Sequence, residues 1–261
     1  MVDINGHQRI FRLDQVTKAY TGRLALSATS LDIQVGECVA VVGPSGSGKT
    51  TLLHLLAGVI QPDSGAIDLN GHKLSDMKPG RELSSLVGVI HQQYDLVPHL
   101  SVLHNVLAGR LGQWGILRSL ISLVSPRDRN LAVKALEQVG LGDRIYERAL
   151  RLSGGEQQRV AIARLLVQGP KVIIADEPVA SLDPARAADL IRHLARIARE
   201  SEKTFISSIH SIDLAREYFD RVIGLRNGEL QFDLPVSALS SDLLAGLYKL
   251  EGLESGIVAQ S

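Results

Sequence analysis

The distribution of apolar and polar residues predicts strands and helices that alternate along most of the chain. Residues 10–35 alternate between the two classes, which is typical of two strands with a turn near Thr21–Arg23. Short, wholly apolar runs at Cys38–Val42 and Val172–Ala175 are instead typical of parallel strands buried on both faces. Further strands are predicted at residues 66–69, 87–90, 205–209 and 221–225. We therefore expect an α/β fold.

Helical periodicity appears in several places between these strands. Thr51–Ala57 follows a loop rich in Gly and Ser, and Pro184–Glu200 carries apolar residues along one face. The pattern is mostly helical from about residue 95 to residue 152, which we interpret as a helical subdomain inserted into the α/β core. An apolar stripe from Ile116 to Val124 favours helix packing inside this subdomain over a surface that faces a partner. Residues 1–245 are expected to form a single domain, and residues 246–261 a weakly patterned tail.

Composition narrows the possible classes of protein. The chain has 261 residues, of which 45% are apolar, enough for one large domain. Its 28 basic and 28 acidic residues balance, so it lacks the basic excess expected of a nucleic-acid-binding protein. The single cysteine, Cys38, lies in an apolar run and is expected to be buried and reduced. No stretch approaches the ~18 apolar residues of a membrane span, and Met1–Arg12 lacks the apolar run of a signal peptide.

A complete phosphate-binding loop follows the apolar run Cys38–Val42. Its residues match the pattern G-x-x-x-x-G-K-[ST] and are Gly43, Pro44, Ser45, Gly46, Ser47, Gly48, Lys49 and Thr50. The glycines let backbone N–H groups point inward at a helix N-terminus, which favours anions. Lys49 would lie between the β- and γ-phosphates of ATP, and the Thr50 hydroxyl would ligate Mg²⁺. Thr51 is expected to face the start of the helix and to complete the phosphate-binding set.

Two carboxylates follow the second apolar strand, Val172–Ala175. Asp176 would hold Mg²⁺ through water, and Glu177 would orient or deprotonate the attacking water. An Asp-Glu pair alone would also fit two surface carboxylates at the end of a strand. The phosphate-binding loop earlier in the chain favours the catalytic interpretation, and the two motifs together predict ATP hydrolysis.

The segment Leu152–Gln158 (LSGGEQQ), followed by Arg159–Arg164, resembles the signature motif of ATP-binding-cassette (ABC) ATPases. A Ser-Gly-Gly that opens a helix offers N–H groups and a dipole to a phosphate. The resemblance covers residues 11–235. It implies a P-loop ATPase core with an N-terminal antiparallel β subdomain and an inserted helical subdomain. It also implies a head-to-tail dimer, in which Ser153, Gly154, Gly155 and Gln157 close on the ATP held by a second copy.

The other motifs of this family occur in the expected order, and the resemblance assigns them roles. Tyr20 would stack on adenine, and Gln92 would touch Mg²⁺ and water. Ser181-Leu182-Asp183 would cross the dimer interface, and His210 would contact the γ-phosphate. The departures from the family pattern are His91 and the run Ser207-Ser208-Ile209, and neither is expected to touch a catalytic position.

Several stretches are similar to the ATPase subunits of phosphonate importers: Gln92–Pro98, Ser101–Gly112, Asp176–Pro184 and Asp213–Glu217. This resemblance implies a separate transmembrane permease and, indirectly, a periplasmic binding protein for phosphonate, phosphite or phosphate-like anions. It implies a peripheral location on the cytoplasmic face of the bacterial inner membrane. The alternatives are an ATPase for another small anion, a cassette beside a soluble phosphonate-metabolising complex, and a soluble ABC ATPase of repair or translation.

Overall fold

The computed structural model of the chain describes residues 8–78, 80–91, 94–114, 128–179 and 183–249. The strands are β1 (Arg9–Tyr20), β2 (Arg23–Gln34), β3 (Cys38–Val42), β4 (Ser64–Leu69), β5 (His72–Lys73), β6 (Val87–Ile90), β7 (Val172–Ala175), β8 (Thr204–Ser208), β9 (Arg221–Arg226) and β10 (Glu229–Pro235). The α-helices are α1 (Lys49–Leu56), α2 (Arg81–Leu86), α3 (Val102–Leu107), α5 (Arg129–Gln138), α6 (Gly154–Gln168), α7 (Pro184–Glu200), α8 (Ile212–Tyr218) and α9 (Ser241–Tyr248). Short 3₁₀ turns are η1 (Leu74–Asp76), η2 (Ala108–Gln113), η3 (Ala149–Arg151) and η4 (Val236–Ala238).

A six-stranded sheet in the order β10-β9-β3-β8-β7-β6 forms the centre of the molecule. Its pairs are parallel from β9 to β6, and β10 is antiparallel to β9. Successive side chains of a strand point to opposite faces of a sheet. Cys38, Ala40 and Val42 of β3 accordingly pack in one hydrophobic core, while Val39 and Val41 pack in another. Both faces of the central strands are therefore buried, as their apolar runs predicted.

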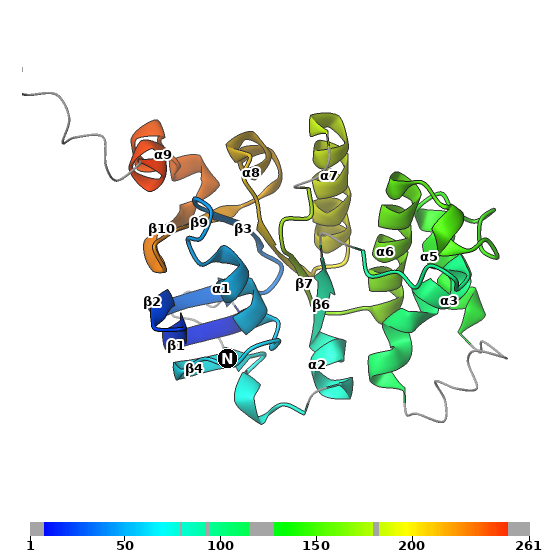
Figure 1. Ribbon diagram of the computed structural model, residues 1–261, viewed down its shortest axis with the longest axis horizontal. Helices are drawn as coiled ribbons and strands as arrows, with labels where there is room; N and C mark the ends of the chain where they lie inside the picture. The colour runs from blue at the N-terminus through cyan, green and yellow to red at the C-terminus, as the bar shows by residue number, and fades with distance from the viewer. Residues whose placement is uncertain (1–7, 79, 92–93, 115–127, 180–182, 250–261) are drawn as a thin grey trace, which may run out of the picture.

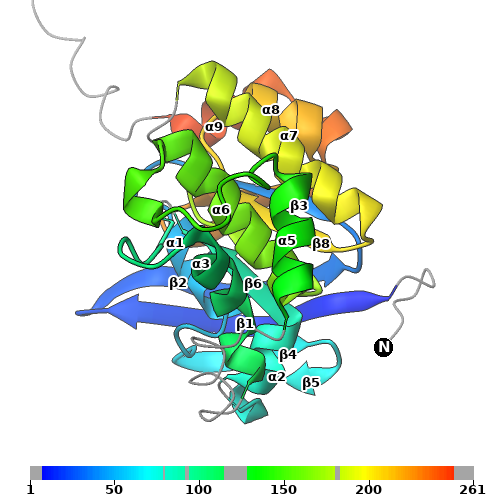
Figure 2. The same ribbon diagram turned by 90° about the vertical axis from the view of Figure 1, so that its right-hand side faces the viewer.

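The two cores are closed by different layers. On one face, α7 and α8 cover the sheet and share its core with Cys38 and Ala40. On the other face, α1 packs against Val39 and Val41, together with a four-stranded antiparallel sheet of order β2-β1-β4-β5. Figures 1 and 2 both show α7 and α8 on one side of the molecule and the antiparallel sheet on the opposite side. The α/β fold with an antiparallel β subdomain is confirmed.

The helical part of the chain lies beside the central sheet, at the end where β6 is the edge strand (Figure 1). Its helices α3 and α5 both pack against α6, which leads back to the sheet through β7. They contribute Val106, Leu136 and Val160 to the shared core, and all three side chains are fully buried. The apolar stripe from Ile116 to Val124 lies outside the described residues.

The predicted elements agree closely with the observed ones. The two N-terminal strands, the turn between them, the helix after the phosphate-binding loop and helix α7 are all confirmed. The strands predicted at 66–69, 87–90, 205–209 and 221–225 appear as β4, β6, β8 and β9, with ends that agree to within two residues. Cys38 is buried, and burial, aided by the nearby Asp220 carboxylate, raises the pKa of its thiol to about 11.

The C-terminal region holds two elements that the sequence pattern did not reveal, β10 and α9. The weakly patterned tail expected from residue 246 onward begins inside a helix, because residues 246–248 belong to the end of α9. Leu247 is buried in the core shared with α7 and α8. The Arg226 guanidinium, at the end of β9, donates hydrogen bonds to the carbonyl oxygens of Gly246 and Lys249, both at 2.7 Å. These contacts anchor the end of α9 to the central sheet.

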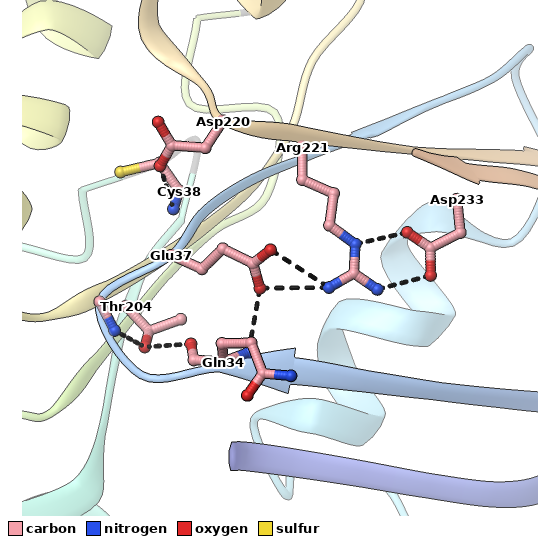
Figure 3. A network of polar contacts seen from close by, with 8 residues as sticks. Gln34, Glu37, Cys38, Thr204, Asp220, Arg221 and Asp233 are labelled. Carbon is pink, nitrogen blue, oxygen red and sulfur yellow. Dashed lines mark hydrogen bonds and ion pairs between the residues drawn. The ribbon is translucent and has the colours of Figure 1, made fainter. Parts of the chain in front are cut away.

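A polar network ties the end of the antiparallel sheet to the central one (Figure 3). Arg221 of β9 donates to both carboxylate oxygens of Glu37, at 3.1 and 3.2 Å, and to Oδ2 of Asp233 on β10 at 2.6 Å. Glu37 in turn accepts from the backbone N–H of Gln34, at the end of β2. Each of the three charged side chains is about four-fifths buried. The network therefore joins β2, β9 and β10 through a single guanidinium.

Candidate functional site

The phosphate-binding loop connects the end of β3 to the start of α1, and its glycines fit against two neighbouring strands. A side chain at Gly43 would place its Cβ 2.1 Å from the carbonyl oxygen of Leu225 on β9. A Cβ at Gly48 would lie 2.3 Å from the carbonyl oxygen of Ala25 on β2. Both glycines also have positive φ angles, 150° and 104°. These two positions require glycine because of close backbone approach as well as backbone conformation.

Lys49 opens α1 and points back into its own loop. Its Nζ donates to the carbonyl oxygens of Gly43 at 2.9 Å and Pro44 at 3.0 Å, and the residue is 4% exposed. Burial lowers the pKa of Lys49, and the nearby carboxylates of Glu177 and Asp176 oppose that effect. The first N–H groups of a helix have no partner within the helix, so α1 directs donors toward the same loop. The loop thus gathers one buried cation and several backbone donors, the requirements of a phosphate site.

A pocket of about 400 Å³ lies over this loop. It is lined by Tyr20, Thr21, Arg23, Leu24, Ala25, Ser45, Gly46, Ser47, Gly48, Lys49, Thr50, Thr51 and Glu177. Tyr20 lies at the end of β1 and is 46% exposed, with the Lys18 ammonium 5.7 Å from its ring centre. The structure thus places an exposed aromatic ring, most of the phosphate-binding loop and one acidic side chain around the same space.

The two predicted carboxylates leave β7 at the carboxyl end of the sheet, beside the start of α1. The Thr50 hydroxyl lies 3.3 Å from Oδ1 of Asp176. Oε1 of Glu177 lies 2.9 Å from Nε2 of His210, which follows β8. The structure therefore brings together Thr50, Asp176, Glu177 and His210, which come from three separate segments of the chain.

The backbone of Glu177 has a left-handed conformation, with φ of 45°. Such a conformation costs an L-residue roughly 1–2 kcal/mol, and it persists where the surroundings determine it. One of these surroundings is Ser208, whose Oγ accepts from the Glu177 N–H at 2.7 Å. The same hydroxyl donates to Oδ1 of Asp176 at 2.7 Å.

The expectation that the run Ser207-Ser208-Ile209 touches no catalytic position is therefore wrong for Ser208. A serine in a short strand carries no sequence signal of its own. The strand register supplies the missing information, because Ala175 pairs with Ser207, and the residues that follow them, Asp176 and Ser208, are joined by a hydrogen bond. Asp176 and Ser208 are separated by 32 residues along the chain, so their contact follows only from the pairing of β7 with β8.

The residues present fit a magnesium–nucleotide complex better than a metal held by protein alone. Among the described residues, no group of three or more His, Cys, Asp or Glu side chains could hold a metal ion. Mg²⁺ usually retains several waters and takes one or two protein oxygens together with phosphate oxygens. The Thr50 hydroxyl, whose residue lines the pocket, and the adjacent Asp176 carboxylate supply such a pair.

The signature segment forms the N-terminus of α6. Ser153 caps this helix in a capping box, in which its Oγ accepts from the Glu156 N–H and the Glu156 carboxylate accepts from the Ser153 N–H. A Cβ built on Gly154 or Gly155 meets no described atom within 4 Å. None of residues 153–157 is among those that line the pocket over the phosphate-binding loop. The signature therefore presents an open surface rather than a wall of that pocket.

The remaining residues that the family resemblance assigned to the site do not line this pocket in the described part of the chain. The amide of Gln157 is directed to the carbonyl oxygens of Leu152 and Ala149, at 3.2 and 3.4 Å, so it braces the loop before α6. Asp183 caps α7 by accepting from the Arg186 N–H, and its carboxylate pairs with the Arg186 side chain at 3.2 Å. Gln92, Ser181 and Leu182 lie outside the described residues.

A second contact that the sequence did not predict reaches the phosphate-binding loop from α9. Burial raises the pKa of the Tyr248 phenol, and the nearby backbone of Gly43, the first residue of the loop, opposes that effect. The carboxyl end of the described chain thus lies close to the loop that contains Lys49.

Comparison with known proteins gives consistent results. The ABC transporter family matches residues 26–180. The chain is 42% identical over 247 residues to the phosphonates import ATP-binding protein PhnC of Pseudomonas fluorescens, covering 94% of this chain and 93% of the relative. It is 45% identical over 231 residues to the protein of the same name from Pseudomonas putida, covering 88% and 86%. A dimeric ATP-binding cassette solved in a post-hydrolysis state with ADP and Pi superposes with a TM-score of 0.72 at 30% identity, covering 87% of this chain and 99% of that one.

Proposed function

This chain belongs to the ABC transporter family of ATP-binding proteins, and from that premise we propose that it is the ATP-hydrolysing subunit of a phosphonate importer. The cargo assignment is supported by relatives that carry the name of a phosphonates import ATP-binding protein and align over most of both chains. No helix in the described part of the chain has the length and hydrophobicity to cross a membrane. In our proposal, separate permease subunits form the membrane path, and this chain binds to them as a peripheral subunit.

One observation carries the proposal of hydrolysis: a single pocket is bordered by a buried lysine, an exposed aromatic ring and a carboxylate in contact with a histidine. In our proposal, Tyr20 stacks on the adenine, and Lys49 and the N–H groups of the loop hold the β- and γ-phosphates. Glu177 accepts a proton from the attacking water, and His210 contacts the γ-phosphate. The 2.9 Å contact between these two side chains keeps both beside the reacting group.

Magnesium has a defined place in this proposal. The Thr50 hydroxyl and Asp176 would hold it, together with Gln92. When bound, the ion supplies positive charge to the phosphate oxygens, where negative charge develops during transfer. The chain contributes the orientation of these oxygen ligands, which depends on β7, β8 and the first turn of α1.

We propose that two copies act together, head to tail. The exposed N-terminus of α6, with Ser153, Gly154 and Gly155, closes on the γ-phosphate of ATP held by the other copy, and Asp183 lies near that interface. ATP binding closes the dimer and drives the permease toward its outward-facing state. Hydrolysis through Glu177 then reopens the dimer. The open surface at the start of α6 supports this assignment.

The complex with its permease and binding protein tests the cargo. The purified assembly in lipid vesicles should hydrolyse ATP faster when the binding protein is loaded with a phosphonate than when it is empty. Phosphite, phosphate and sulfate serve as comparison anions. If phosphate or sulfate stimulates hydrolysis and phosphonates do not, the cargo is a different small anion. If the chain purifies with soluble enzymes and without a permease, the importer assignment fails.

A further inference from the structure

Ser208 lies at the point where the phosphate-binding and acidic segments meet, although no sequence motif includes it. It ends β8, which is flanked by β3 on one side and β7 on the other. Ser208 is fully buried, and its hydroxyl makes two hydrogen bonds of 2.7 Å, one with the Asp176 carboxylate and one with the Glu177 N–H. A serine hydroxyl has one proton to donate and lone pairs to accept, so both bonds form at the same time.

The face of the sheet on which Ser208 lies explains why it reaches this site. Side chains alternate along a strand, so Ser208 shares its face with Ile206, which packs in the core beneath α1. Ser207 shares the opposite face with Phe205, which packs in the core of α7 and α8. The Ser207 hydroxyl donates to the Ser208 carbonyl oxygen at 3.3 Å. Two adjacent, fully buried serines therefore differ in whether they face the site.

We infer that Ser208 is a positioning residue for ATP hydrolysis, an inference that rests on the proposed function. Its bond to Oδ1 of Asp176 fixes the same oxygen that lies 3.3 Å from the Thr50 hydroxyl. Its bond to the Glu177 N–H holds a left-handed backbone conformation that sets the direction of the Glu177 side chain toward His210. Ser208 thus couples the orientation of the proposed metal ligand to that of the proposed base.

The role predicts a specific kinetic pattern. Ser208→Ala removes the donor to Asp176 and leaves the Glu177 N–H without its acceptor, so the site loses its alignment while Lys49 and Tyr20 remain in place. We expect kcat for ATP hydrolysis to fall about 10- to 100-fold, with the KM for ATP changed less than about threefold. The Mg²⁺ concentration for half-maximal rate should rise, because the Asp176 carboxylate is no longer oriented.

Three further variants make the test decisive. Ser208→Thr keeps the hydroxyl and should retain most of the rate. Ser208→Cys replaces the hydroxyl by a thiol, a weak donor, and should behave like Ser208→Ala. It therefore serves as the test if the alanine variant does not fold. Ser207→Ala, the matched control on the opposite face, should keep wild-type kcat and Mg²⁺ dependence. Thermal unfolding of each variant shows whether a rate has fallen because the fold was lost.

The outcomes separate this inference from the proposal on which it rests. If the wild-type chain does not hydrolyse ATP, the proposed function itself fails. If Glu177→Gln, included as a reference, hydrolyses ATP at the wild-type rate, the assignment of Glu177 as the base fails. If Glu177→Gln is inactive but folded Ser208→Ala or Ser208→Cys matches Ser207→Ala in kcat and in Mg²⁺ dependence, the role of Ser208 is refuted.

Discussion

At the scale of single residues, Glu177 is the position on which the proposed chemistry depends most directly. It contacts His210 at 2.9 Å, and about a third of its side chain is exposed at the pocket. A glutamine has the same shape but cannot take a proton from water, so ATP should still bind while turnover falls by about 10²- to 10⁴-fold. With hydrolysis blocked, Glu177→Gln should accumulate as a closed dimer.

Gel filtration with and without Mg·ATP, combined with a phosphate-release assay, measures both effects of Glu177→Gln. The exposed carboxylate Glu200, whose ion pair with Arg196 spans 4.0 Å, offers a control. Glu200→Gln should hydrolyse ATP normally and show no trapped dimer. A Glu177→Gln protein that stays monomeric in ATP and turns over at the wild-type rate would contradict the assignment of the base.

At the scale of elements, the Arg221 network decides how the C-terminal strands are joined to the rest of the fold. Arg221 bridges Glu37 and Asp233, and all three side chains are about four-fifths buried. Removing the guanidinium would leave two largely buried carboxylates close together without a cation. We expect Arg221→Ala to lower the free energy of unfolding by about 2–4 kcal/mol, as measured by urea denaturation.

An exposed arginine provides the comparison for this prediction. Arg196 is 56% exposed and forms its ion pair with Glu200 on the surface of α7, so Arg196→Ala should change the free energy of unfolding by less than about 1 kcal/mol. Equal urea midpoints for the two variants would show that the network contributes no more than a surface pair. Because β9 also carries Leu225, against which Gly43 packs, loss of the network should weaken nucleotide binding in Arg221→Ala.

At the scale of the whole molecule, the proposed dimer divides each ATP site between two copies. Lys49→Ala disables the phosphate-binding loop of its own copy, and Gly154→Asp places a carboxylate on the open start of α6, where a side chain meets no described atom within 4 Å. Each variant alone should be inactive. In an equal mixture, about half of the dimers contain both variants, and each of these has one site with an intact loop and an intact signature.

Phosphate release from the mixture measures this complementation. Activity should reappear on mixing, up to about a quarter of the wild-type rate, and should increase with protein concentration. A mixture of Lys49→Ala with Ser208→Ala provides the control. Both changes affect the part of the site that holds ATP and leave the signature intact. Every ATP site in a mixed dimer of these two variants therefore still carries one of the two changes. Gly154→Asp protein that hydrolyses ATP normally by itself would show that the signature is not part of the site.

The local motifs of the site could be predicted from the sequence, whereas the contacts that distant residues make with these motifs could not. The phosphate-binding loop and the pair Asp176-Glu177 could be predicted because each is a short run of consecutive residues at the end of a buried strand. Such a run has its geometry largely set by local backbone rules, and both runs lie next to the pocket or line it. The central strands β3 and β7 were predictable for a similar reason, since burial on both faces leaves a continuous apolar run.

What only the tertiary structure decided is which distant residues meet these local motifs. The hydrogen bond between Ser208 and Asp176, the approach of Tyr248 to the loop at Gly43, and the bridge from Arg221 to Glu37 each bring together segments separated by 32 to 205 residues. Single residues with hydroxyl, phenol or guanidinium groups form no periodic pattern in the sequence from which their partners could be predicted. Their partners follow from strand order and register, which the packing of the whole chain selects. The sequence by itself therefore determined the chemistry of the site, and the tertiary structure determined what holds that chemistry in position.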